Sequence, residues 1–341
     1  MRSIKHPVTF ESIVMLLVAA VLAPVAASAQ IMPPTPLETP QPEPPTNRFS
    51  MPMEGFAIVR YSVLADGSVA NVSTIDQMPA TLSERNVRAT VESWTFEPAT
   101  RDGTAVDWHN NEAVMIFDVE TIPAEPSPMF VRGYRQVEDL LAEGEQEDAL
   151  DRSDRLLGME ASRLAEMGVG FVQNARVNMM LGNLHEAYAA IERATNPDLS
   201  LLDPSELVVA LEYRNTLELR LGDVVGALET FARRQELGTV PESDLMASNL
   251  ATIEAALGGD AAIGVQGKIL DEAWSHELTR RTFAVGDVDG TLRQVDIKCD
   301  MGTAEFEFSD ESEWSLPESW GECTVTVLGR RDAEFVLYEF Q

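Results

Sequence analysis

The stretch Trp94-Thr95-Phe96-Glu97-Pro98 decides how the first folded module is interpreted. Upstream of it, Val87, Val91 and Trp94 follow one another at i, i+4 and i+7, which places three apolar side chains on one face of a helix. The stretch therefore ends a helix and starts an extended segment.

Period-two patterns on both sides of this helix predict strands. Residues from Gly55 onward alternate, and Asp66-Gly67 supplies a two-residue hairpin turn, because glycine adopts the required positive φ at little cost. The predicted order is strand, strand, helix, strand within residues 53–121. The elements are a strand from Gly55 to Leu64, a strand from Val69 to Ile75, a helix opened by the capping box Thr81-Leu82-Ser83-Glu84, and a strand from Ala113 to Glu120.

This order resembles the C-terminal domain of the TonB family. The family pattern is a strand led by glycine, an x-D-G-x turn, a second strand, a helix, W-x-[YF]-x-P and a final V-x-F-x-V strand. The resemblance implies a binding activity, in which a short segment of an outer-membrane receptor adds as a strand to a sheet edge. It places the partner-binding edge on the last strand. Its residues are Ala113, Val114, Met115, Ile116, Phe117, Asp118, Val119 and Glu120.

Residues 128–262 repeat a helical pattern with glycines about 40 residues apart. A helix, a glycine turn and a second helix with a small residue at the close crossing are typical of a helical-hairpin solenoid. The pattern resembles degenerate tetratricopeptide (TPR) repeats, and the clearest unit runs from Ala175 to Ala194, with Pro197 as a stop. The repeated positions are Glu143-Gly144, Leu181-Gly182, Leu221-Gly222 and Leu257-Gly258, then Ala149, Ala187 and Ala227, and finally Ile191 and Phe231.

Residues 264–341 return to period two and predict a small antiparallel sandwich or barrel. The only cysteines of the chain, Cys299 and Cys323, lie in this module, and in an oxidising compartment they are expected to form a disulfide. A redox thiol pair is the alternative, but the C-x-x-C spacing is absent. Five strands are predicted: Glu277 to Val285, Thr291 to Cys299, Ala304 to Phe308, Cys323 to Leu328 and Glu334 to Phe340.

Residues 1–29 have the three parts of an export signal: a positive start, an apolar run from Ile13 to Ala23, and a small-x-small site at Ala27-Ser28-Ala29. Retention of this segment as a membrane anchor is the alternative. Residues 30–52 form a proline-rich linker, expected to be an extended, poorly ordered spacer that cannot pack a core. The formal net charge of −31 opposes binding to nucleic acid or to anionic membranes.

No motif in the sequence predicts catalysis, a cofactor or a metal. His109, His185 and His276 lie in three different modules and are expected to be surface or half-buried polar residues. Asp287-Val288-Asp289-Gly290 has the start of a calcium loop without its remainder, so a hairpin turn explains it. The sequence therefore predicts a protein that is not an enzyme and has protein partners.

Together these patterns predict a multidomain α+β protein. It consists of a small TonB-like ββαβ domain, an α-helical hairpin array similar to TPR repeats, and a C-terminal antiparallel β module. The function expected is periplasmic protein binding in outer-membrane transport or envelope assembly. Two alternatives stay open: a membrane-anchored TonB-type energy transducer, and an enzyme with its site in the C-terminal β module.

The mature N-terminus separates the first two hypotheses. Cleavage after Ala29 leaves Gln30 as the first residue and a periplasmic binder without access to an ion gradient. Mass spectrometry of the protein recovered from its native envelope is expected to find Gln30 at the terminus. An intact Met1 in that fraction would favour the anchored transducer.

Overall fold

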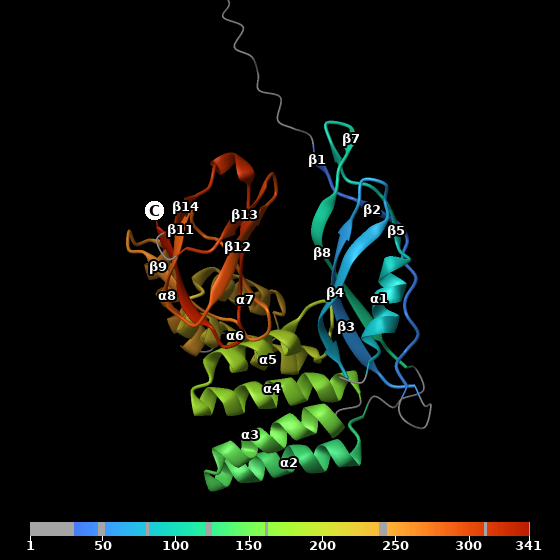
Figure 1. The fold of residues 1–341 in the computed structure, drawn as a ribbon. Coiled ribbons are helices and arrows are strands. Elements are labelled where there is room, and N and C mark those ends of the chain that lie inside the picture. The colour runs from blue at the N-terminus through green and yellow to red at the C-terminus, as the bar shows by residue number, and fades with distance from the viewer. Residues whose placement is uncertain are drawn as a thin grey trace, which may run out of the picture.

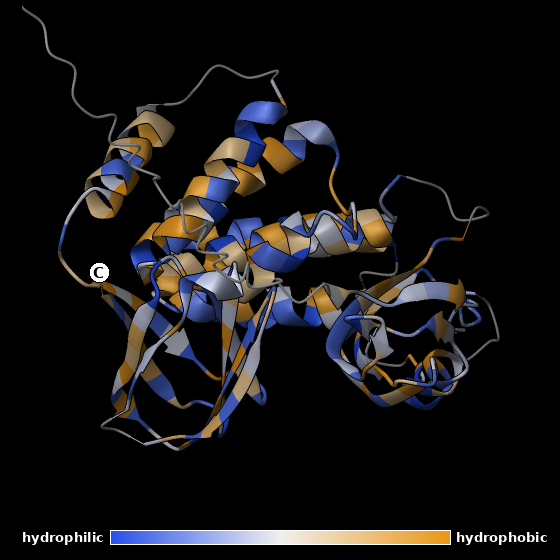
Figure 2. Cartoon of the chain, turned by 90° about the horizontal axis from the view of Figure 1, so that it is seen from above, coloured by the Kyte–Doolittle hydropathy of each residue, from blue (hydrophilic) through white to orange (hydrophobic). Residues whose placement is uncertain are grey.

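The computed structural model describes residues 31–46, 52–79, 82–119, 125–160, 163–238, 244–309 and 312–340. Figure 1 shows two β modules standing side by side on a stack of helices, and Figure 2 shows the same separation from above. The predicted export signal, residues 1–29, lies outside the described residues.

The first β module is built around a three-stranded antiparallel sheet in the order β4-β3-β8. One face of the sheet packs on α1 through a core that includes Val59, Val87 and Met115. The other face turns Phe56 into the core of the helical stack. The elements are β3 (Gly55–Val63), β4 (Val69–Met78), α1 (Glu84–Glu92), β5 (Thr95–Glu97), β6 (Thr100–Arg101), β7 (Thr104–Ala105) and β8 (Trp108–Phe117).

The turn between β3 and β4 is longer than the predicted two-residue turn. The Gly67 amide donates to the carbonyl of Leu64, and the Leu64 amide donates to Ser68, so Ala65 and Asp66 occupy the centre of the turn. Gly67 follows in the left-handed region, at φ 83°. A Cβ there would collide with the carbonyl of Phe96, so the glycine is needed for conformation and for close approach.

Helix α1 begins later than the predicted capping box implies. Its N-cap is Ser83, whose hydroxyl accepts a hydrogen bond from the amide of Asn86. Thr81, the expected N-cap, lies outside the described residues. Ser83, two residues after Thr81, therefore caps the helix. Val87 and Val91 are fully buried, as their spacing predicts.

Residues 31–46 of the proline-rich segment, expected to be a poorly ordered spacer, instead pair with the sheet module. Within it, β1 (Ile31–Met32) pairs with β6, and β2 (Thr35–Glu38) pairs with β5. The indole Nε1 of Trp94 donates a hydrogen bond of 2.9 Å to the carbonyl of Pro40. Proline cannot donate a backbone hydrogen bond, but its carbonyl can accept one, so the segment docks along the module that follows it.

The middle of the chain is a stack of helical hairpins. Gly144, Gly182 and Gly222 each end a helix in the left-handed conformation, and the next helix starts within a few residues. The small residues Ala149, Ala187 and Ala227 are fully buried, as a close crossing of helices requires. The helices are α2 (Pro128–Glu143), α3 (Gln146–Arg155) with a π-helical turn at Leu156–Glu160, α4 (Leu164–Leu181), α5 (Leu184–Thr195), α6 (Pro204–Leu221), α7 (Val224–Glu236) and α8 (Asp244–Leu257).

The fourth predicted repeat position, Leu257-Gly258, does not form a hairpin. Helix α8 ends at Leu257, and the chain continues into β9 rather than into another helix. Ile253 of α8 belongs to the hydrophobic core of the C-terminal β module. The last helix therefore packs against the sandwich. This contact buries its apolar side, which a partner helix would otherwise cover.

The C-terminal module is a sandwich of two four-stranded sheets, ordered β10-β15-β12-β13 and β14-β11-β16-β9. Apolar side chains of both sheets, such as Val295 and Phe283, meet in one core. Figure 2 shows hydrophobic and hydrophilic residues alternating along these strands. The strands are β9 (Ile263–Lys268), β10 (Ala273–Glu277), β11 (Thr282–Asp289), β12 (Leu292–Cys299), β13 (Thr303–Glu307), β14 (Glu313–Ser315), β15 (Cys323–Gly329) and β16 (Glu334–Phe340), with a 3-10 turn at Glu318–Trp320.

Several strand predictions for this module need correction. The single strand expected from Glu277 to Val285 is the end of β10 and the start of β11, which lie in different sheets. The Asp287–Gly290 turn likewise connects two sheets, so it is not a hairpin. Strands β9 and β14 are additional. Alternation along the chain does not reveal where a strand leaves one sheet for the other, because both sheets bury every second residue.

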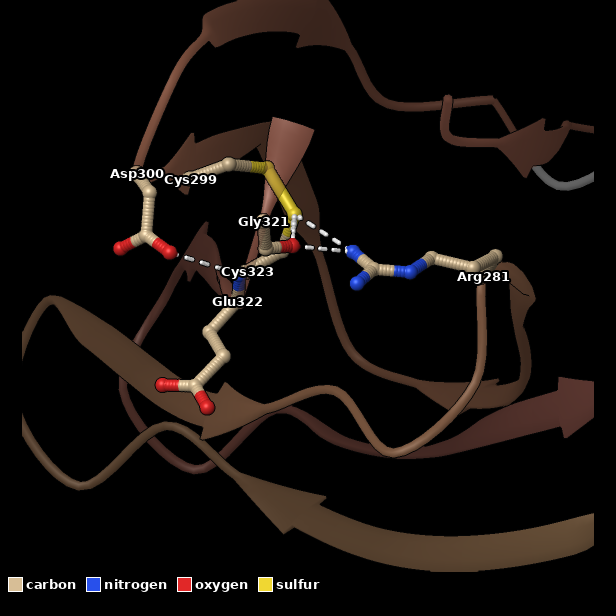
Figure 3. Close-up of a disulfide and its surroundings, with 6 residues drawn as sticks. All are labelled: Arg281, Cys299, Asp300, Gly321, Glu322 and Cys323. Carbon is tan, nitrogen blue, oxygen red and sulfur yellow. Dashed lines mark hydrogen bonds between the residues drawn. A yellow bond between two sulfur atoms is a disulfide. The ribbon is translucent and has the colours of Figure 1, made fainter. Parts of the chain in front are cut away.

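Cys299 and Cys323 form the expected disulfide, and they are direct partners across the β12–β15 pair. Figure 3 shows that the guanidinium of Arg281 points at this bond, with Nη1 lying 3.4 Å from the Sγ of Cys323 and contacting the carbonyl of Gly321. On the other side, the Glu322 amide donates to the carboxylate of Asp300. The crosslink thus joins the end of β12 to the start of β15, the two inner strands of their sheet.

Hydrogen bonds and close backbone contacts attach both β modules to the helices. The Leu164 amide, at the start of α4, donates to the carboxylate of Glu54, and Arg193 of α5 makes a two-pronged ion pair with Asp76 of β4. On the sandwich side, the Gly222 turn lies against the backbone of Gly264 in β9.

The Gly222 contact yields a stability prediction with a matched control. Gly144→Ala is expected to lower the free energy of unfolding by about 1–2 kcal/mol, the cost of a side chain in the left-handed conformation. Gly222→Ala is expected to cost about 1–3 kcal/mol more, because its methyl group also collides with the carbonyl of Gly264. Urea titrations of the two variants give the comparison, and equal losses would contradict the contact.

Candidate binding surface

The predicted edge residues fall largely on one strand. Ala113 to Phe117 lie in β8, Asp118 and Val119 follow the strand, and Glu120 lies outside the described residues. In the sheet order, β8 pairs with β3 on one side and with no other strand of the described chain. Its outer side therefore has backbone donors and acceptors that are not used by the sheet.

The side chains of β8 alternate between two environments. Met115 and Phe117 are buried in the core shared with α1, whereas Val114 and Ile116 face the other way, and Ile116 is 38% exposed. Val114 packs at the margin of the helical core. A strand added beside β8 would therefore have one face toward the helical stack.

The N-terminal half of β8 contacts the sandwich. The backbone of Asn110 has a left-handed conformation, with φ 56°. The register of the β3–β8 pair shifts beside this residue. Its carbonyl accepts a hydrogen bond of 2.9 Å from the Nζ of Lys298 on β12. Burial lowers the pKa of the Lys298 amine from its ordinary value. This contact joins the two β modules across the space between them.

A groove opens between the two β modules above the helices. It comprises two adjoining cavities of about 920 and 690 Å³, which share a set of six lining residues. We call it the central groove. Its walls come from β4 and β8, from α4 and α5, and from β9, β10 and the loop that joins them. The shared residues are Ile75, Glu112, Ala189, Glu192, Leu270 and Asp271.

Carboxylates outnumber cations in the central groove. Nine acidic and four lysine or arginine side chains line it, and each cation already pairs with one of those acids. The pairs are Arg60–Glu112, Arg193–Asp76, Lys268–Glu186 and Arg331–Asp271. The remaining five carboxylates are Asp154, Glu192, Asp198, Asp223 and Glu272.

Glu192 has a special position among these carboxylates. Its side chain is exposed to the groove, yet the surrounding protein displaces enough water to raise the pKa of its carboxyl. The nearby Arg214 opposes that shift, but it donates its Nε to Glu218 at 2.7 Å instead of to Glu192. The phenol of Tyr188, whose pKa burial raises well above its ordinary value, also lines the groove.

The three histidines have different surroundings. His109 is exposed and lies 3.2 Å from the hydroxyl of Ser62, and His185 is half-buried in the groove. His276 is buried, which corrects the expectation that it is a surface or half-buried residue. Its Nε2 lies 3.0 Å from Glu339 and its ring stacks on Trp274, because β10 and β16 approach each other there.

The described residues contain no group of three or more His, Cys, Asp or Glu side chains placed to hold one metal ion. They also contain no helix whose length and hydropathy fit a membrane span.

Sequence reasoning missed the central groove entirely. Its lining comes from segments as distant as Ile58 and Arg331, and no local pattern connects them. The only sequence signal is the excess of acidic residues, which extends over the whole chain and does not single out the groove.

The fold defines a small sheet module of the TonB C-terminal type, a helical-hairpin stack of the TPR type and a β sandwich. Residues 40–113 match the family model described as "Gram-negative bacterial TonB protein C-terminal", so this region carries a TonB C-terminal domain. The match starts within the docked proline-rich segment and ends at Ala113, the first of the predicted edge residues.

Solved structures resemble two parts of the chain. The first TPR domain of Spaghetti (RPAP3), bound to an HSP90 peptide, is 16% identical, with a TM-score of 0.33, and the match covers 39% of this chain and 96% of that one. The Sgt2 TPR domain of Aspergillus fumigatus is 19% identical, with a TM-score of 0.33, covering 39% and 82%. The Pseudomonas aeruginosa TonB C-terminal domain is 23% identical, with a TM-score of 0.23, covering 26% and 90%. No curated protein matches this chain.

The groove position of His185 yields a pH prediction. Burial lowers the pKa of its imidazole below 6.5, so the unfolded chain takes up its proton first as the pH falls. The contribution of His185 to stability is therefore lost as the pH drops through about 6.5. We expect an NMR titration of ¹³C-labelled histidine to give His185 a midpoint below 6.5, with His185→Gln identifying its signal. A midpoint above that value would contradict the assigned burial.

Proposed function

We propose that this chain is a periplasmic protein-interaction protein of the cell envelope. It binds an outer-membrane receptor or another envelope protein, in outer-membrane transport or in envelope assembly. The observation that carries the proposal is the outer side of β8, which pairs with no other strand of the described chain and whose first residues, up to Ala113, lie in the region that matches the TonB C-terminal family. An extended partner segment would pair with the free backbone groups of β8, and side chains beside the strand would select its sequence.

Three further features support binding rather than catalysis. The TonB-type and TPR-type regions are of kinds that typically bind other proteins. The interior of the C-terminal sandwich is filled by apolar side chains from both sheets. Both ring nitrogens of its buried histidine, His276, face carboxylates, with Nδ1 3.8 Å from Asp223 and Nε2 3.0 Å from Glu339.

Two observations support the proposed compartment. The Cys299–Cys323 disulfide is of the kind that persists where proteins are oxidised, as in the periplasm. The TonB family match also favours the envelope.

Site-specific photo-crosslinking tests strand addition to β8. A benzoylphenylalanine at Ile116, exposed on β8, is expected to crosslink to an envelope protein in intact cells, whereas the same residue at Val209, exposed on α6, is not. Mass spectrometry identifies the crosslinked protein. Its purified extended segment is then expected to slow amide hydrogen exchange in residues 113–117 of the full mature chain.

Two results would count against the proposal. One is that Ile116 and Val209 give the same crosslinked proteins. The other is that the captured segment leaves exchange in residues 113–117 unchanged, because added strand pairing must protect those amides.

A further inference from the structure

The central groove has room for a ligand longer than a small molecule. Its two adjoining cavities, of about 920 and 690 Å³, together exceed the range of roughly 300–1,000 Å³ that is usual for small-molecule pockets. They are continuous through shared residues such as Ile75 and Leu270. A groove of this size between three modules suits a length of peptide.

The lining combines apolar contact area with negative charge. Ile75 is 40% exposed in the groove, beside the half-buried Val114 and Leu270. The cations of the groove are already neutralised by acids, so the five remaining carboxylates set its charge. An acidic peptide would be repelled here, and the matching partner has lysine or arginine side chains among apolar ones.

We propose that the central groove binds a lysine- or arginine-bearing peptide segment of a partner protein, with Glu192 and Glu272 as principal charge contacts. Glu192 comes from α5 and Glu272 from the loop after β9, so the segment contacts the helical stack and the sandwich together. Neither carboxylate has a hydrogen bond or ion pair within the described chain. The inference stands apart from strand addition, because no backbone pairing with β8 is needed.

The pH dependence of binding follows from the position of Glu192. Its carboxyl pKa is raised by the surrounding protein, so lowering the pH neutralises it before an ordinary glutamate. A bound cation favours the ionised carboxylate, and binding therefore weakens as the pH falls through the pKa of Glu192.

Fluorescence anisotropy with defined peptides tests the groove in the full mature chain. The probe is a labelled dodecapeptide that alternates Lys and Val, and its counterpart has Glu in place of Lys. The lysine peptide is expected to bind, with an affinity that falls as salt is added, and the glutamate peptide is not. In the variant Glu192→Gln/Glu272→Gln, binding is expected to weaken about tenfold, the loss typical of two charge contacts.

A charge-matched control separates the groove from the net charge of the chain. Glu236→Gln/Glu254→Gln removes two exposed carboxylates from α7 and α8, outside the groove, and is expected to leave the affinity within about twofold. Circular dichroism checks that both double variants fold.

Three outcomes would overturn the inference. They are equal weakening by the two double variants, absence of binding by the lysine peptide, and comparable binding by the glutamate peptide. None of them bears on strand addition, because that proposal is tested with the segment captured at Ile116, whereas these outcomes are measured with the lysine and glutamate peptides. The proposal for the groove and the proposal for strand addition can therefore be refuted separately.

Discussion

The rest of the structure depends on the left-handed glycines that end α2, α4 and α6. Each leaves its helix at a positive φ that other residues adopt only with strain, so the next helix folds back at once. The buried alanines that follow let the paired helices approach closely. The result is a rigid stack on which both β modules stand, and Gly222 serves twice, because its turn also contacts the sandwich.

The two β modules are attached in different ways. The TonB-type sheet is held by the carboxylate of Glu54 at the start of α4, by the Asp76–Arg193 ion pair, and by an apolar core with the helices. The sheet residues in that core are Phe56, Ile58, Met78 and Val114. The sandwich shares a continuous hydrophobic core with α7 and α8.

Local sequence patterns predicted most of the helices and strands, and the disulfide. Periodicity placed β3, α1 and the helical hairpins, and the cysteine pair of the sandwich formed as expected. The errors have physical causes. The strand from Glu277 to Val285 was divided because the chain changes sheets there, and Leu257-Gly258 made no hairpin because the sandwich covers the last helix. The proline-rich segment docked because Trp94 offers an indole donor to the carbonyl of Pro40.

The sequence by itself determined the three modules, the family resemblance of the first, and the edge strand from Ala113 to Phe117. These follow from local periodicity, glycine conformation and residue spacing, which act over a few residues. The tertiary structure alone decided the central groove and the burial of His276 against Glu339. Their residues lie far apart in the chain and meet only because both β modules stand side by side on the helices (Figure 1), an arrangement that no local pattern encodes.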